Sequence, residues 1–147
     1  MLAGTLPKGR RRDIVKTIAL IGIIGTRKRN TAAAFDLIKN VFDEIYEEGN
    51  WLCSGGCPKG GDRYAEQLAK AEGIPIITFY PNYKRFKGGA PIIRNGDIAD
   101  TSDKIIACVM HPEDGIDAVL ERKSGGTEDT LKKFVKRTCD KSKIYLV

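Results

Sequence analysis

The run TIALIGII, residues 17–24, is apolar at almost every position and rich in isoleucine. A strand with one solvated face alternates apolar and polar residues, whereas a continuous apolar run is typical of a strand buried on both faces. Strands of that kind occur in parallel sheets, because crossover helices cover both faces of the sheet. The run therefore predicts a central parallel strand and, with it, an α/β fold.

Strand-like and helix-like segments alternate along the rest of the chain. Apolar runs predict strands at 17–24, 51–54, 74–80, 104–110 and 143–147. Apolar residues at helical spacing and capping residues predict helices that begin near Thr31, Asp62, Ile92 and Thr127, the first ending by Gly49 and the second at Gly73. Residues 81–91 have no period and are predicted to be a loop, while 111–123 are ambiguous between a loop and one helical turn.

This alternation predicts a Rossmann-like three-layer α/β/α domain over residues 16–147, with a mainly parallel five-stranded sheet in the order 3-2-1-4-5. In such folds the ligand binds outside the carboxyl ends of the strands, at the switch point where the strand order reverses. Residues 1–15 are polar and basic and contain Gly and Pro. We expect them to form a flexible N-terminal arm outside the domain.

Composition narrows the class of protein. A chain of 147 residues is long enough for one domain with its own core. No apolar run approaches the about 20 residues of a membrane helix, and the basic N-terminus lacks the order of a signal peptide, so we expect a cytoplasmic protein without membrane contact. The net charge of +6 favours anionic partners. We interpret it as a solvated basic face, because a nucleic-acid footprint requires a sharper stripe with interleaved aromatic residues.

The cysteines and the known cofactor motifs indicate no resident metal or cofactor. Cys53 and Cys57 form a CxxxC without a second pair, and the only histidine is His111. Cys53 and Cys108 are expected to be free thiols buried in strands. A GxxxxGK[ST] motif is absent, as is a GxGxxG after the first strand, which argues against a P-loop ATPase and an ordinary dinucleotide dehydrogenase.

Three glycine-bearing loops follow predicted strand ends, and the strands before them are neighbours in the proposed order. The loops would then line one crevice, and two of them begin helices, whose free N–H groups and dipole favour an anion. The candidate binding residues in these loops are Gly25, Thr26, Arg27, Gly55, Gly56, Gly60, Gly61, Asp62, Arg63, Ser124, Gly125, Gly126 and Thr127. Glycines would let backbone amides surround a phosphate, and Arg27, Arg63 or Arg94 would add charge-assisted contacts. Asp62 would either accept a hydrogen bond from a sugar hydroxyl or cap its own helix.

Three segments together resemble a known family. SGGCPKGGDRYAE (54–66), GGAPIIRNGDIADTSDKIIA (88–107) and SGGTEDTLK (124–132) are similar, in this order, to YspA-like proteins of the SLOG superfamily, which includes DprA and the LOG phosphoribohydrolases. The similarity covers roughly residues 17–147. It implies a Rossmann-like domain that binds a nucleotide or a nucleotide-derived ligand. By position it places the following residues at the site: Gly55, Gly56, Gly61, Asp62, Arg94, Asn95, Gly125, Gly126 and Thr127.

The chain departs from the phosphoribohydrolase pattern at one position. Those enzymes have PGGxGTxxE, whose glutamate assists cleavage of the N-glycosidic bond, and alignment on Gly126-Thr127 places Thr130 at that glutamate. Glu128 and Asp129 lie one or two residues too early on a helix that turns about 100° per residue. Together with Asp62 they are weak candidates for a catalytic acid.

Three functions stay open at this point. The first is a SLOG-type sensor or sequestering protein for a nucleotide-type small molecule. The second is an enzyme that acts on the N-glycosidic bond of a nucleotide, similar to phosphoribohydrolases or nucleoside deoxyribosyltransferases. The third is a DprA-like nucleic-acid binder that uses the N-terminal arm and Arg27–Arg29. A homodimer or higher homo-oligomer is a further open question, because the superfamily is often dimeric. Tyr80 and Tyr83 are candidates to stack on a base, and His111 is interpreted as a loop histidine.

Overall fold

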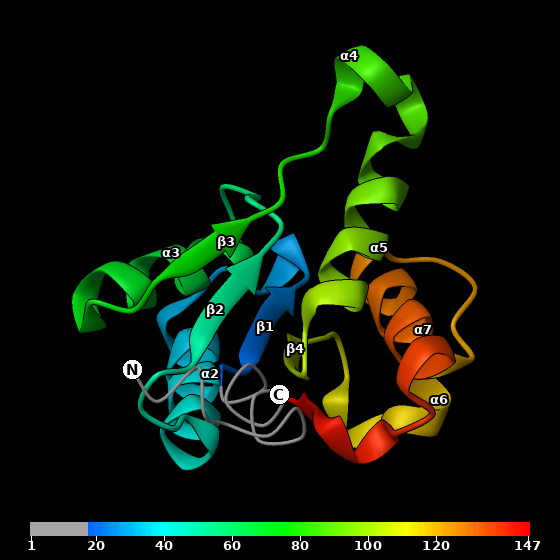
Figure 1. Cartoon of the computed structure of the whole chain (residues 1–147). Helices are drawn as coiled ribbons and strands as arrows, with labels where there is room; N and C mark the ends of the chain where they lie inside the picture. Colours follow the sequence, from blue (N-terminus) through cyan, green and yellow to red (C-terminus); the bar gives the residue numbers. More distant parts are fainter. Residues whose placement is uncertain (1–17) are drawn as a thin grey trace, which may run out of the picture.

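A computed structural model describes residues 18–147, which form an α/β fold around a five-stranded sheet (Figure 1). All four strand pairs are parallel, and the order is β3-β2-β1-β4-β5, which confirms the predicted topology. The strands are β1 (Leu20–Gly25), β2 (Trp51–Ser54), β3 (Ile76–Thr78), β4 (Lys104–Cys108) and β5 (Ile144–Leu146). The predicted N-terminal arm, 1–15, lies outside the described residues.

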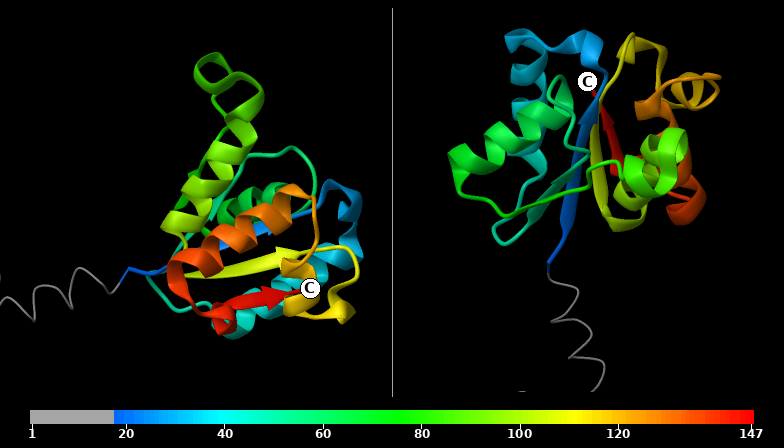
Figure 2. Two further views of the ribbon diagram at one scale, coloured as in Figure 1. Left: turned by 90° about the vertical axis from the view of Figure 1, so that its right-hand side faces the viewer. Right: turned by 90° about the horizontal axis from the view of Figure 1, so that it is seen from above.

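Helices cover both faces of this sheet (Figure 2). The long helices are α2 (Ala32–Ile45), α3 (Gly61–Glu72), α5 (Ala90–Thr101) and α7 (Gly126–Thr138). The short helical segments are η2 (Arg27–Arg29), α4 (Tyr83–Phe86), η3 (Lys87–Gly89), η4 (Pro112–Asp114), α6 (Ile116–Leu120) and η5 (Lys141–Lys143). Helices α2 and α3 pack on one face, and α5 and α7 pack on the other.

The alternation of side chains along β1 explains why its sequence is apolar throughout. Ile21 and Ile23 are fully buried against the layer of α2 and α3, whereas Ile24 is buried in the core on the α5 and α7 side. Successive side chains of a strand point to opposite faces, so a strand between two helix layers needs apolar residues at every position. Burial on both faces is therefore what the isoleucine run encodes.

Local capping sets the start and end of the helices next to the predicted loops. The Thr31 side chain accepts a hydrogen bond from the Ala34 N–H at 3.2 Å and begins α2, and Gly73, with φ +66°, ends α3. Helix α2 ends at Ile45, four residues before the predicted Gly49, which lies in the following turn with φ +93°.

The prediction that 81–91 is a loop is wrong. Helix α4 occupies 83–86, a 3-10 turn follows, and α5 begins at Ala90, two residues before the predicted start. The Asn82 side chain accepts a hydrogen bond from the Arg85 N–H at 3.1 Å and caps α4. A helix of one turn is too short to show a 3.6-residue period, so the sequence pattern could not reveal it.

Segment 111–123 contains two short helical segments, η4 and α6, where the sequence suggested one helical turn. None of the helices in the described part of the chain is long and apolar enough to cross a membrane.

Candidate functional site

A cavity of about 580 Å³ opens at the carboxyl ends of the central strands. Because parallel strands all end at the same edge of the sheet, the loops after β1 and β2 and the start of α7 come together there. Residues of α5 complete the wall. Eleven of the predicted binding residues line the cavity: Gly25, Thr26, Arg27, Gly55, Gly56, Asp62, Arg94, Asn95, Gly125, Gly126 and Thr127.

Four other predicted residues, Gly60, Gly61, Arg63 and Ser124, do not line the cavity. A Cβ at Gly61 would lie 2.5 Å from the Ile24 carbonyl oxygen, and one at Gly60 would lie 2.6 Å from that of Thr26. These two glycines therefore allow α3 to approach the end of β1 closely. Arg63 and Ser124 are exposed.

Asp62 is a buried carboxyl group at the base of the glycine loop, with 7% of its surface exposed. Its Oδ2 accepts a hydrogen bond from the Cys57 N–H at 3.2 Å. Gly60 occupies the N-cap of α3, and no side chain caps this helix, so the capping role considered for Asp62 is not observed. Burial raises the pKa of Asp62 to about 6, although the loop N–H groups and the Arg94 charge oppose that rise.

Arg94 and Asn95 connect the glycine loop to α7. The Arg94 guanidinium donates to the Gly55 carbonyl and, at 3.1 Å, to Asn95 Oδ1. Asn95 in turn donates to Asp129 Oδ2 at 3.1 Å, which also accepts from Lys133 at 2.9 Å. Asp129, one of the weak catalytic candidates, is thus held by two donors and lies outside the cavity lining.

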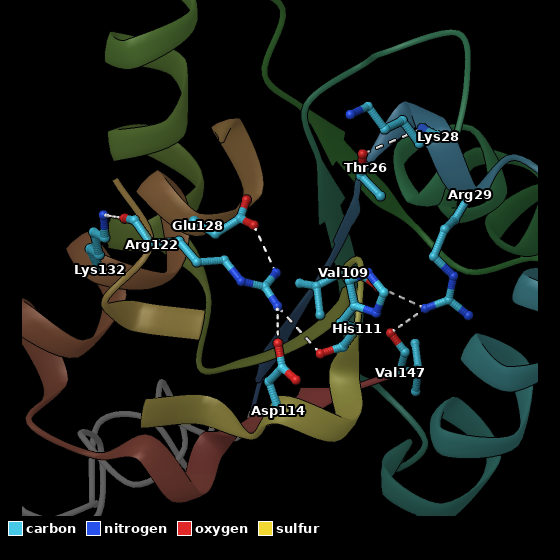
Figure 3. A network of polar contacts seen from close by, with 10 residues as sticks. All are labelled: Thr26, Lys28, Arg29, Val109, His111, Asp114, Arg122, Glu128, Lys132 and Val147. Atoms are coloured by element: carbon cyan, nitrogen blue, oxygen red, sulfur yellow. Dashed lines mark hydrogen bonds and ion pairs between the residues drawn. The ribbon is translucent and has the colours of Figure 1, made fainter. Parts of the chain in front are cut away.

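Glu128 is the weak catalytic candidate that α7 brings to the cavity wall. Its carboxylate lies over Gly125, where a Cβ would displace it, and the φ of +119° at Gly125 disfavours any residue with a side chain. Arg122 pairs with Glu128 at 3.1 Å and with Asp114 at 3.3 Å, as Figure 3 shows. Thr130, which stands at the aligned glutamate position, is buried and donates to the Gly126 carbonyl at 3.1 Å.

Arg29 has a role that the sequence analysis did not predict (Figure 3). Its Nη1 donates to the carbonyl oxygens of Val109 at 2.9 Å and Val147 at 2.7 Å, and so it joins the ends of the two segments that contain β4 and β5. Arg29 does not line the cavity, whereas its neighbours Arg27 and Lys28 do. Two cations of this basic cluster therefore face the candidate site, and the third stabilises the fold.

Apolar groups form a further part of the cavity wall. Segment 81–91, which was predicted to be a loop, contributes Pro81, Tyr83 and Pro91. Other parts of the chain contribute Ile24, Pro58 and Ile98. Tyr83 was one of the two candidate stacking residues. The other, Tyr80, lies against Gly56 at the cavity edge, where its ring carbons are 2.5 Å from the position of a Cβ.

His111 takes no part in the lining. It is exposed, and its Nδ1 lies 3.0 Å from Glu113 Oε1. Cys53 and Cys108 are buried free thiols, as predicted. Within residues 18–147, no group of three or more His, Cys, Asp or Glu side chains is arranged to hold a metal ion.

The arrangement combines three kinds of group in one cavity. Helix N-termini and cations favour an anion, a buried carboxyl group can accept hydrogen bonds from hydroxyls, and Tyr83 with the prolines offers an apolar surface.

Comparisons of the chain with protein-family models, with curated proteins and with solved structures find no match.

Proposed function

We propose that this protein binds a nucleotide or nucleotide-derived ligand in the cavity and acts as a sensor or sequestering protein. The observation on which the proposal rests is that the glycine loops, the N-terminus of α7, Arg94 and the buried Asp62 all line one cavity. A volume of about 580 Å³ lies within the range of small-molecule sites. The resemblance of the sequence motifs to SLOG proteins supports the same ligand class.

Each part of a nucleotide has a matching part of the cavity. A phosphate fits the free N–H groups at the N-terminus of α7, with Arg27 and Arg94 nearby. A ribose hydroxyl fits Asp62, because an ionised carboxylate accepts hydrogen bonds and has no proton to donate. A base fits the face of Tyr83, since aromatic rings stack on bases.

The proposal is tested by thermal unfolding with a panel of ligands. The panel holds nucleoside monophosphates, NAD, ADP-ribose, cyclic nucleotides and the matching nucleosides without phosphate. A ligand at 100 times its Kd that binds only the folded state stabilises it by about 2.7 kcal/mol, which raises Tm by several degrees. We expect one nucleotide to do so and its nucleoside to have a much smaller effect.

Two glycine variants make this test specific. A Cβ at Gly126 meets only Asn95 Nδ2, at 4.0 Å, so Gly126→Val should fold and obstruct the mouth of the cavity. Gly96 on α5 has open space around it and does not line the cavity, which makes Gly96→Val the matched control. Loss of the shift in Gly126→Val alone supports the cavity as the site. An equal shift in both variants would contradict it.

A second candidate function is cleavage of the N-glycosidic bond of a nucleotide. Two carboxyl groups in different surroundings line the cavity: Asp62, with its pKa raised to about 6, and Glu128, paired with Arg122. Such a cavity suits acid catalysis, because the Asp62 carboxyl group can hold a proton near neutral pH, and the Glu128 carboxylate lies on the same wall beside the Arg122 guanidinium. Release of free base from the bound nucleotide, lost in Asp62→Asn, would favour the enzyme over the sensor.

A further inference from the structure

Residues 80–93 form a projection that extends beyond the rest of the domain (Figures 1 and 2). We call it the α4 projection. It contains α4, η3 and the first turn of α5, and only Ala90 within it is buried. Nine large apolar side chains are exposed in residues 18–147, and five of them belong to this short segment: Tyr80, Tyr83, Phe86, Ile92 and Ile93. Such a concentration marks an interaction surface.

The charge of the projection has one sign. Lys84, Arg85 and Lys87 are exposed, and none of the three forms an ion pair within the described chain. From residue 73 to residue 96 the sequence contains no Asp or Glu. The partner that complements this surface is therefore an anion with apolar faces.

Aromatic and cationic residues are interspersed along α4 and the first residue of η3, in the order Tyr83, Lys84, Arg85, Phe86, Lys87. Single-stranded nucleic acid is recognised by this combination, because bases stack on aromatic rings while cations follow the phosphates. The Tyr80 ring lies against the backbone at Gly56 yet is 66% exposed, so its position is fixed while most of its surface stays free.

The projection is also continuous with the cavity. Pro81, Tyr83, Pro91 and Arg94 belong to the projection or to the turn of α5 that follows it, and all four line the cavity. A polymer with one nucleotide in the cavity would pass directly onto the exposed rings. We propose that the ligand is a single strand of nucleic acid, with its terminal nucleotide in the cavity and the following nucleotides on the α4 projection. The inference rests on the proposed function for the cavity and extends it from one nucleotide to a strand.

The test uses fluorescence anisotropy of labelled single strands of about 12 nucleotides, in DNA and RNA form. The projection variant is Lys84→Gln, Arg85→Gln and Phe86→Ala, since none of these residues lines the cavity. We expect the strand to bind more tightly than the mononucleotide, and the variant to lose about tenfold or more in affinity. The salt dependence should also weaken, by about 0.7 in slope for each phosphate contact removed.

The matched control is Lys70→Gln with Lys136→Gln. Both lysines are exposed, near the C-terminal ends of α3 and α7, and the change in charge equals that of the projection variant. Helices α3 and α7 run antiparallel to the strands, so their C-terminal ends, and with them the two lysines, lie at the opposite end of the strands from the cavity. The control should therefore keep its affinity for the strand and most of the salt slope.

The outcomes separate this inference from the proposed function. A mononucleotide shift that survives in the projection variant, with strand affinity lost, supports both. A mononucleotide shift with no tighter binding of strands overturns the inference alone. Strand binding that depends on the projection, without any mononucleotide shift, supports the projection as the binding surface but overturns both the cavity proposal and the placement of the terminal nucleotide in the cavity. If Phe86→Ala lowers the sedimentation coefficient of the free protein and leaves strand affinity unchanged, the projection is an interface between copies and the inference is wrong.

Discussion

The carboxyl group of Asp62 makes the stability of this protein depend on pH. Burial raises its pKa from 3.8 to about 6 in the folded chain, so folding favours the protonated form. Its contribution to the free energy of unfolding is greatest below the unfolded pKa and is lost as the pH rises through about 6. Each unit of difference between the folded and unfolded pKa corresponds to about 1.4 kcal/mol. The rise from 3.8 to about 6 therefore costs about 3 kcal/mol of stability at about pH 8.

Asp62→Asn should remove this dependence, because an amide oxygen can still accept the Cys57 N–H but does not ionise. We expect the variant to unfold with nearly the wild-type free energy at about pH 4 and to be the more stable protein at about pH 8. Urea unfolding of both proteins across this range measures the difference. A difference that stays constant with pH would mean that Asp62 is not the buried acid.

Gly61 is a residue at which α3 approaches the end of β1 closely. A Cβ there would lie 2.5 Å from both the carbonyl carbon and the oxygen of Ile24, which are backbone atoms and cannot rotate away. Gly61→Ala should therefore destabilise the fold by about 1–3 kcal/mol. Gly88→Ala, where a Cβ meets nothing within 4 Å, is the control and should change little. Denaturant midpoints compare the two, and equal midpoints would contradict the packing role.

Helix α5 contains a glycine that its packing does not require. Gly96 lies in the middle of the helix, and a Cβ there would meet no atom within 4 Å. Alanine lowers the backbone entropy of the unfolded chain, so Gly96→Ala should stabilise the protein by about 0.5–1 kcal/mol. Thermal unfolding checks the gain, and ligand binding should stay unchanged. A loss of stability would contradict the open space around Gly96.

The sequence predicted best those elements that have a local signal. Burial on both faces explains the isoleucine run of β1, and capping chemistry explains the helix ends at Thr31 and Gly73. The strand order followed from the alternation of strands and helices. The sequence did not predict α4, because a single turn of helix capped by Asn82 is too short to show a hydrophobic period.

The candidate site was predicted where it depends on loops and missed where it depends on distant partners. Strand order alone placed the three glycine loops at one edge, and eleven predicted residues line the cavity. Arg29 and Arg122 belong to basic stretches in the sequence, yet their partners are backbone carbonyls and carboxylates from other elements. No local pattern distinguishes such a cation from a solvated one.

The molecule as a whole combines two buried apolar layers, one on each face of the sheet, with the α4 projection, which is almost entirely exposed. Helices α2 and α3 close one face of the sheet, α5 and α7 close the other, and β1 and β4 lie between them. Residues 81–89 include no buried side chain. Local opening needs little free energy where few apolar contacts are broken, so stability should differ sharply between these regions.

Amide hydrogen exchange should reveal that difference and respond to the ligand. We expect residues 81–89 to exchange fastest among the helical segments and β1 and β4 slowest, because the latter require opening of the whole domain. With a saturating mononucleotide, exchange should slow in the loops at 25–28, 55–58 and 125–128, which line the cavity, and not in α2, which lies outside it. With a single strand, protection should extend to 81–89. Protection of α2, with the three loops unchanged, would place the ligand on another face and contradict the cavity as the site.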